Sequence, residues 1–209
     1  CLAATERKTL LVDFDPQGNA TSGLGCEDPG TDGGSYALVI GGRSAESVIR
    51  PTALEHLHLI PSGIDLTGAE MELVQTSDRE FRLLEAIKPL NEYYRYILID
   101  CPPSLGLLTL NALVAANSLI IPLQCEYYAL EGLSKLSHTV TLVQQGFNPG
   151  LTMEGVLLTM FDGRTSLARQ VADDVRQNFH GRIFDTVVPR NVRLSEAPSH
   201  GKPIILYDI

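Results

Sequence analysis

The chain has 209 residues and a mass of 22.8 kDa, which is the size of one α/β domain with a buried core. This size excludes a mini-protein that depends on disulfides or metal ions for stability. With 44% hydrophobic and 20% charged residues, the composition excludes a disordered or fibrous chain. The net charge of −9 argues against a nucleic-acid partner for the chain as a whole, yet residues 160–202 carry seven Lys or Arg against five acids. This basic segment could contact phosphates, although a solvated helix face has the same composition.

Membrane and export signals are absent from the sequence. The longest apolar runs, such as Leu119–Ile121, fall far short of the roughly 18 residues that span a bilayer, and the first eight residues lack the pattern of a secretory signal. No Cys-x-x-Cys pair or zinc-finger spacing occurs among Cys1, Cys26, Cys101 and Cys125. We therefore expect a cytoplasmic protein with reduced thiols and no membrane partner.

Six short aliphatic or β-branched runs predict strands, and each is continuous rather than alternating, as in strands buried on both faces. They are Thr9–Val12, Leu57–Ile60, Tyr96–Ile99, Leu119–Ile121, Val156–Leu158 and Thr186–Val188. Helical periodicity predicts helices over Arg79–Leu90, Leu107–Ala116, Ala129–Gln145 and Ser166–Phe179. This alternation predicts an α/β fold with a mostly parallel central sheet and helices on both faces, in which ligands bind at the carboxyl ends of the strands.

No linker or repeat divides the chain, so we expect a single domain over residues 1–209. The Gly- and Asp-rich segment Glu27–Gly34 predicts a surface loop within it.

Two carboxylates, Asp13 and Asp15, leave the end of the first predicted strand, and Pro16 stops that strand. Residues two apart in a strand point to one side, so both side chains should face the same space. Without an adjacent base in sequence, such a pair is suited to hold a divalent cation or to orient a water molecule. A helix N-cap is the alternative role for either residue.

Two further strand ends carry polar residues. The run Tyr96–Ile99 is followed by Asp100, which has the form of a Walker B element whose carboxylate holds Mg²⁺, usually through water. Together with Asp13 and Asp15, it predicts a cation site at one edge of the sheet. After the last strand, residues 187–201 predict a polar loop that either reads a base or is an ordinary surface loop.

Four segments carry a family resemblance: VDFDPQGNATSGLG (residues 12–25), DCPPSLG (100–106), QCEYYALEG (124–132) and PRNVRLSEAPSHG (189–201). In this order they closely resemble the ParA/Soj chromosome-partitioning ATPases, which are P-loop NTPases of the deviant Walker type. The likeness runs from Leu2 to Ile209. Within the superfamily, the third and fourth segments are similar to the chromosomal partitioning branch.

The resemblance implies the site residues. By it, Asp15 positions the attacking water, Asp13 supports the magnesium shell and Asp100 holds the metal. Two further sets are implied, in which Pro189 and Asn191 contact the adenine, and Arg164 and Arg193 bind DNA without sequence preference. The alternative is that one of these arginines pairs with a neighbouring acid such as Asp162 or Glu196. It also implies ATP and Mg²⁺ as cofactors, an ATP-dependent homodimer associated with the nucleoid, and a ParB-type partner that stimulates hydrolysis.

One motif of that family does not occur in these 209 residues: the deviant P-loop of the type Lys-Gly-Gly-Val-Gly-Lys-Thr, which supplies a backbone N–H cradle and phosphate-binding lysines. We therefore expect an N-terminally truncated chain that lacks its first strand and P-loop as well as its C-terminal helix. Because the missing strand is central in relatives, its neighbours should be left with unpaired backbone groups. The chain by itself should be unstable and inactive.

Three alternative functions remain open on the sequence. A membrane-cycling ATPase of the septum-positioning type would need a C-terminal amphipathic helix, which these residues do not contain. A non-hydrolysing interaction module would follow if the P-loop is truly absent from the protein. An iron–sulfur ATPase would use Cys101 and Cys125 as cluster ligands, although both cysteines are suited to packing a strand end.

Overall fold

The computed structural model describes residues 1–31 and 33–208. Asp32, inside the predicted loop Glu27–Gly34, and Ile209, the last residue of the expected domain and of the resemblance, lie outside the described residues. The chain divides into two compact units. Unit 1 comprises Cys1–Ala115 and Ser195–Ile209, and unit 2 comprises Ala116–Leu194.

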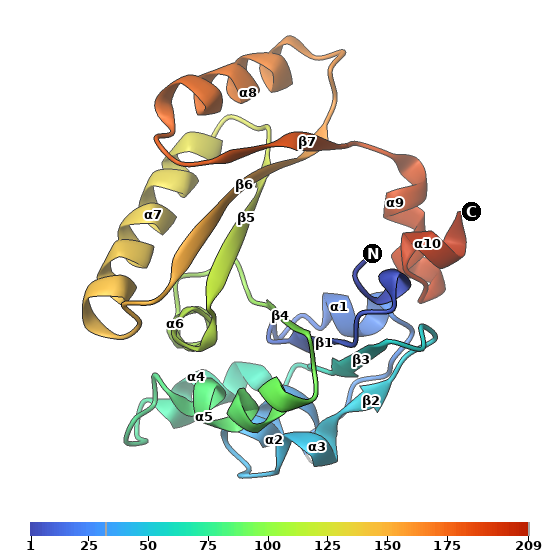
Figure 1. The fold of residues 1–209 in the computed structure, drawn as a ribbon, viewed down its shortest axis with the longest axis vertical. Coiled ribbons are helices and arrows are strands. Elements are labelled where there is room, and N and C mark those ends of the chain that lie inside the picture. Colours follow the sequence, from blue (N-terminus) through green and yellow to red (C-terminus); the bar gives the residue numbers. More distant parts are fainter. Residues whose placement is uncertain (32, 209) are drawn as a thin grey trace. The chain divides into compact units, whose positions relative to one another are not determined.

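Unit 1 is built on a four-stranded sheet with the order β2-β3-β1-β4 (Figure 1). The central strand β1 (Thr9–Asp13) runs parallel to both β3 (Leu57–Ile60) and β4 (Tyr96–Asp100). The two-residue strand β2 (Arg50–Pro51) pairs with β3 in the antiparallel direction. Since β1 has a neighbour on each side, its residues are buried except for the partly exposed Leu11.

The helices of unit 1 are short. They are η1 (Ala3–Thr5), α1 (Asn19–Gly23), α2 (Gly34–Val39), α3 (Ala45–Val48), α4 (Leu66–Leu73), α5 (Arg82–Ile87), η2 (Lys88–Glu92), α6 (Leu107–Ala115), η3 (Ala197–His200) and α10 (Ile204–Tyr207). The apolar side chains of α2, α3, α4, α5, η2 and α6 pack with those of β1 and β3 into one core, in which Leu10, Val12 and Phe14 are fully buried. Burial of such side chains is the main stabilising contribution to this unit.

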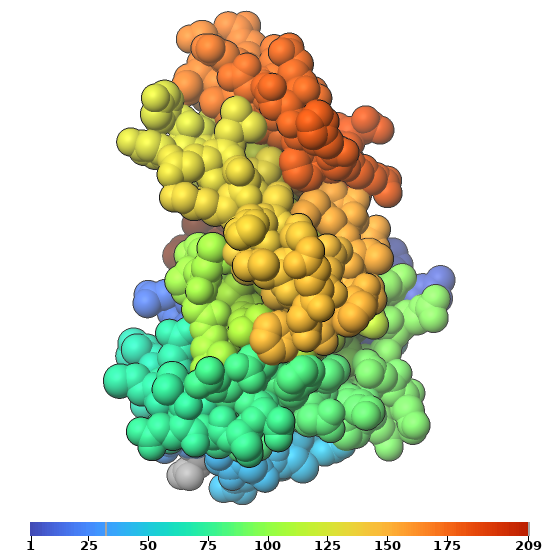
Figure 2. All heavy atoms as spheres, turned by 90° about the vertical axis from the view of Figure 1, so that its left-hand side faces the viewer, coloured from blue at the N-terminus to red at the C-terminus, as the bar shows by residue number. Residues whose placement is uncertain are grey.

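Unit 2 is a three-stranded parallel sheet with the order β5-β6-β7, formed by Ser118–Gln124, Thr152–Phe161 and Ile183–Pro189. Helices α7 (Ala129–Gly146) and α8 (Ser166–Asn178) pack their apolar faces against it, and Figure 2 shows their outer faces in yellow to orange-red. Thr165 caps α8 by accepting a hydrogen bond from the backbone N–H of Ala168. Helix α9 (Val192–Glu196) follows β7 and crosses the boundary between the units.

The α/β class with mostly parallel strands is confirmed, as are all six predicted strands and the four predicted helices, within a few residues. The strands form two sheets, and β4 and β5 each have one hydrogen-bonded neighbour among the described strands. Burial on both faces was wrong for β4 and β5, whose Leu98 and Ile120 are 45% and 54% exposed. The prediction of a polar loop over residues 187–201 was also wrong, because this segment contains α9 and η3.

No helix in the described part of the chain is long and apolar enough to cross a membrane.

Candidate functional site

The carboxylates of the first two motifs meet at the carboxyl end of the unit 1 sheet. Asp13 of β1 and Asp100 of β4 are register partners in adjacent parallel strands. The strands stay paired one residue further, because the backbone N–H of Phe14 donates to the carbonyl oxygen of Asp100 at 2.7 Å. The sequence prediction that these two strand ends lie together is therefore confirmed.

Asp13 is completely buried and caps helix α1. Its Oδ2 accepts two hydrogen bonds from Thr21, from the backbone N–H at 2.7 Å and from the hydroxyl at 2.6 Å, and its Oδ1 accepts the N–H of Asp15 at 3.3 Å. Thr21 is the third residue of α1, whose first-turn N–H groups have no partner within the helix. The N-cap residue of α1 is Gly18, so Asp13 satisfies the N–H of Thr21 from the end of β1 and not as an N-cap residue.

The Asp13 cap extends into a buried hydrogen-bond network that the sequence did not reveal. The Thr21 hydroxyl also accepts the backbone N–H of Ser62 at 2.8 Å, which ties α1 to the segment after β3. The hydroxyl of Ser35 donates to the backbone carbonyl of Asp13. These partners are 22 to 41 residues distant in sequence, and single Ser or Thr residues give no motif by which to find them.

Asp15 lies in the turn between β1 and α1 and is half-buried. Its Oδ1 accepts the backbone N–H of Gln17 at 3.0 Å, and its carbonyl accepts that of Gly18 at 2.9 Å. Gly18 has φ +61°, and a Cβ there would lie 3.0 Å from the carbonyl oxygen of Ser62. The turn therefore fixes the backbone at Asp15 next to the Asp13 cap.

The charges of this cluster oppose one another. Burial raises the pKa of Asp13, and burial followed by the charges of Asp13 and Asp15 raises the pKa of Asp100. Cys101, the next residue, has its pKa raised to about 11 by burial and by Asp100 and Asp15. A cation at this edge would relieve the repulsion among the carboxylates of Asp13, Asp15 and Asp100. The raised pKa of Cys101 keeps its thiol protonated at neutral pH.

The donor set at this edge suits magnesium in part. Carboxylate oxygens are the ligands that Mg²⁺ prefers, and the ion usually keeps several waters and takes only one or two protein carboxylates. Among residues 1–31 and 33–208, no group of three or more His, Cys, Asp or Glu side chains could hold a metal ion. The cluster fits a magnesium ion held by few side chains and completed by water and nucleotide phosphates.

The motifs DPQGNATSGLG and SEAPSHG lie against each other in unit 1, where η3 packs on α1. Gly25 has φ +73° and Gly201 has φ +60°. A Cβ on Gly201 would come within 2.7 Å of the Cα of Gly25, so only two glycines allow this approach. The sequence left the second motif open between base recognition and an ordinary surface loop, and it did not reveal this contact between segments 176 residues apart.

The predicted adenine-binding residues lie at the end of β7 in unit 2. Pro189 is the last strand residue and the register partner of Phe161. Asn191 follows, and its Oδ1 accepts the backbone N–H of Arg193 at 2.7 Å, so this side chain caps the start of α9. The structure brings Pro189, Asn191 and Arg193 together within five residues.

Arg164 is held by the neighbouring acid. Its Nε donates to Oδ1 of Asp162 at 2.9 Å and its Nη2 donates to Oδ2 at 2.7 Å, while its side chain remains 90% exposed. The alternative that a predicted phosphate-binding arginine pairs with Asp162 is therefore observed. This arrangement does not test DNA binding by Arg164 or Arg193, which stays a prediction.

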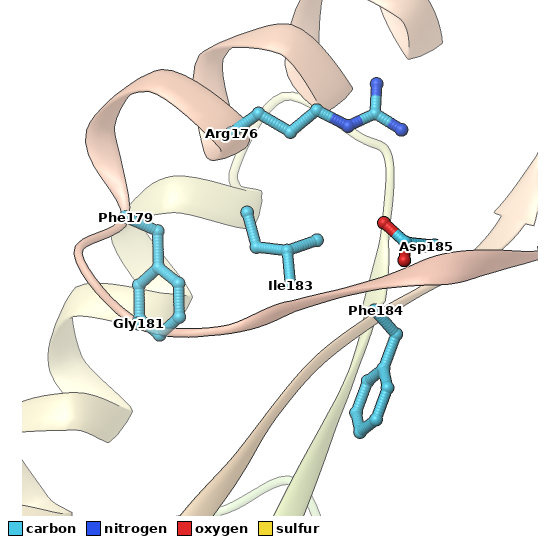
Figure 3. A pocket seen from close by; sticks show the side chains of 6 residues that line it. All are labelled: Arg176, Phe179, Gly181, Ile183, Phe184 and Asp185. Carbon is cyan, nitrogen blue, oxygen red and sulfur yellow. The ribbon is translucent and has the colours of Figure 1, made fainter.

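Unit 2 also has a shallow cavity of about 300 Å³ beside the end of α8. Figure 3 shows the Arg176 side chain at the top, with Ile183 beneath it between Phe179 on one side and Asp185 on the other. It is lined by none of the sequence-predicted site residues.

The comparisons with known proteins agree with this geometry. The family model described as an AAA domain matches residues 1–153. The chain is 61% identical to the chromosome partitioning protein ParA of Myxococcus xanthus over all of this chain and 74% of that protein, and 56% identical to the sporulation initiation inhibitor protein Soj of Bacillus subtilis over all of this chain and 82% of that protein. The crystal structure of cobyrinic acid a,c-diamide synthase from Mycobacterium smegmatis with bound ADP and magnesium is 39% identical, with a TM-score of 0.84 over 90% of this chain and 78% of that one.

The fold and the family model together define an α/β protein with an AAA domain. The chain belongs to the ParA/Soj family of chromosome-partitioning ATPases. The resemblance drawn from its four motifs is therefore confirmed.

Proposed function

We propose that this ATPase separates DNA copies by a nucleotide-controlled cycle, in which an ATP-bound dimer binds DNA without sequence preference and a ParB-type partner stimulates hydrolysis that releases it. The observation that carries this proposal is the pairing of Asp13 with Asp100 at the end of adjacent parallel strands, with Asp15 one turn away. The Myxococcus relative is a chromosome partitioning protein.

In the proposed reaction, a water attacks the terminal phosphate in line with the leaving group. Asp15 orients this water, and Asp100 holds Mg²⁺, which neutralises charge on the phosphates when bound. Asp13 supports the magnesium shell through its cap on α1 and its hydrogen bond to the backbone of Asp15. The relative with bound ADP and magnesium supports both ligands.

Pro189 and Asn191 are proposed to contact the adenine from the end of β7. The proposal also requires a phosphate-binding loop, and the 209 residues contain no Lys-Gly-Gly-Val-Gly-Lys-Thr segment. We therefore expect the 209-residue chain by itself to turn over no ATP.

For DNA, the proposed contacts are Arg164 and Arg193, which follow the ends of β6 and β7 in the basic segment 160–202. A guanidinium keeps its charge at any cellular pH and grips two phosphate oxygens with one planar edge. Each Arg→Ala change should weaken binding equally on every sequence. It should also flatten the log–log salt dependence by roughly 0.9 per lost phosphate contact, counted twice in a symmetric dimer.

The test of the reaction is Asp15→Asn in the full-length protein. An asparagine Oδ1 can still accept the N–H of Gln17, so the turn is kept while the carboxylate is lost. We expect ATP binding and dimerisation to persist and turnover to fall at least tenfold, which is about 1.4 kcal/mol of transition-state stabilisation. Turnover at the parental rate would remove Asp15 from the mechanism.

A further inference from the structure

The turn between β6 and α8 places one carboxylate on the very arginine that is proposed to bind DNA. Asp162 and Arg164 form two parallel hydrogen bonds, at 2.9 and 2.7 Å, through the Nε and Nη2 edge of the guanidinium. A phosphate presents two oxygens to arginine in the same fork geometry. The carboxylate of Asp162 therefore occupies the edge that a DNA phosphate would take.

The position of Asp162 is fixed by its own turn. Its Oδ1 also accepts the backbone N–H of Arg164 at 3.1 Å, and its carbonyl accepts the N–H and the hydroxyl of Thr165 at 3.1 and 3.0 Å. The Asp162 side chain is only 21% exposed, whereas that of Arg164 is 90% exposed. The carboxylate is thus built into the fold, while the guanidinium can move.

A second arginine lies close to the same carboxylate. The backbone N–H of Arg190 donates to the carbonyl of Phe161 at 3.0 Å, next to Asp162 in sequence. Hydrogen bonds from Arg164, with a smaller contribution from the charge of Arg190, lower the pKa of Asp162 to about 2. Asp162 is therefore ionised at every pH at which DNA binding would be measured.

We propose that Asp162 is an intramolecular competitor for DNA phosphate, which holds Arg164 in a fork and thereby lowers the affinity of the protein for DNA. This inference rests on the proposed function, because it concerns the same DNA contact. A phosphate must displace the carboxylate or accept the other edge of the guanidinium. In a protein that must leave DNA after hydrolysis, such a competitor keeps binding weak enough to reverse.

Asp162→Asn is the informative variant, because an asparagine Oδ1 can still accept the N–H of Arg164 and only the charge and the fork are lost. The matched control is Asp173→Asn on α8, which removes the same charge from an exposed ion pair, with Arg176 at 3.5 Å. Binding of the full-length protein with ATP and Mg²⁺ to random duplex DNA is measured as a function of salt. Arg164→Ala alone, and Asp162→Asn combined with Arg164→Ala, complete a double-mutant cycle.

We expect Asp162→Asn to tighten DNA binding about two- to fivefold per protomer, the range of an exposed ion pair, and Asp173→Asn to tighten it clearly less. In the Arg164→Ala background the gain from Asp162→Asn should fall to that of the control. Equal gains from the two Asp→Asn variants, weaker binding by Asp162→Asn, or a gain that persists without Arg164 would overturn the inference. If the unmodified protein does not bind DNA, or if Arg164→Ala and Arg193→Ala both bind like the parent, the proposed DNA contact itself fails.

Discussion

Replacing Thr21 by valine tests how much the buried cap at the carboxylate cluster stabilises the protein. Valine has nearly the shape of threonine, so the change removes the hydroxyl and little else. Two hydrogen bonds are lost, the one donated to Asp13 at 2.6 Å and the one accepted from the N–H of Ser62 at 2.8 Å. A hydrogen bond to a charged group is worth about 1.5–3 kcal/mol, and a buried N–H left without a partner costs about 1–3 kcal/mol.

The expected loss for Thr21→Val is therefore about 3–5 kcal/mol of unfolding free energy. Thr21→Ser is the matched control, because it keeps the hydroxyl and loses one buried methyl group, which costs about 1 kcal/mol. Urea unfolding of the full-length protein, followed by far-UV circular dichroism, measures this loss. If the valine and serine variants unfold within about 1 kcal/mol of each other, the hydroxyl does not stabilise the cap.

The same variant has a distinct pH dependence. Burial raises the pKa of Asp13 above its ordinary value, so ionisation of this group opposes folding. That cost is present in full above the folded-state pKa and is lost as the pH falls through it toward the ordinary value. Without the Thr21 hydroxyl the pKa rises further and the cost grows. The stability gap between parent and Thr21→Val should therefore narrow on acidification, and a gap that widens would refute this reasoning.

Three further changes have definite expected results. Ser62 is 2% exposed, and its hydroxyl has no hydrogen-bond partner within residues 1–31 and 33–208, so Ser62→Ala should raise the unfolding free energy in urea by about 1 kcal/mol, and a loss would indicate a partner. Gly201→Ala should destabilise by more than the about 1–2 kcal/mol of a left-handed residue, because its Cβ meets the backbone of Gly25; Gly30→Ala, at φ +62° in open space, should show only the smaller cost. Asp100→Ala in the full-length protein should raise the Mg²⁺ concentration needed to bind a fluorescent ATP analogue, and an unchanged Mg²⁺ titration would assign Asp100 a structural role.

Local patterns were sufficient for the elements that hold the site. The aliphatic runs at Thr9–Val12 and Tyr96–Ile99 predicted β1 and β4, and the acids behind them predicted where the carboxylates gather. The sequence did not predict strand β2, because it has only two residues and one of them is Pro51. It did not predict α4 either, because the few buried residues of this helix give a weak hydrophobic periodicity. Helix α9 has five residues and begins directly after Asn191, which caps it. In the sequence, this polar residue after a strand was indistinguishable from part of a loop.

Long-range contacts set the limit of that prediction. The Gly25–Gly201 approach depends on two left-handed residues that meet only after both segments have folded, and Thr21 serves Asp13 and Ser62 from different parts of the chain. Neither arrangement leaves a period or a spacing in the sequence. By contrast, Asp162 and Arg164 are only two residues apart in the sequence. Asp162 could therefore be named in advance as the alternative partner of that arginine.

The division of labour among the three aspartates follows from their surroundings. Both carboxylate oxygens of Asp13 accept hydrogen bonds from N–H and hydroxyl donors. Asp13 is therefore suited to hold α1 and the following turn rather than to bind a metal ion directly. Asp15 is half-buried in a turn that fixes its backbone, which suits a group that must aim at a water. Asp100 has its pKa raised by burial and by the charges of Asp13 and Asp15, so a nearby cation would stabilise its ionised form. We therefore expect three different roles for these three side chains, and the variants at Thr21, Asp15 and Asp100 should separate them as effects on stability, turnover and Mg²⁺ dependence.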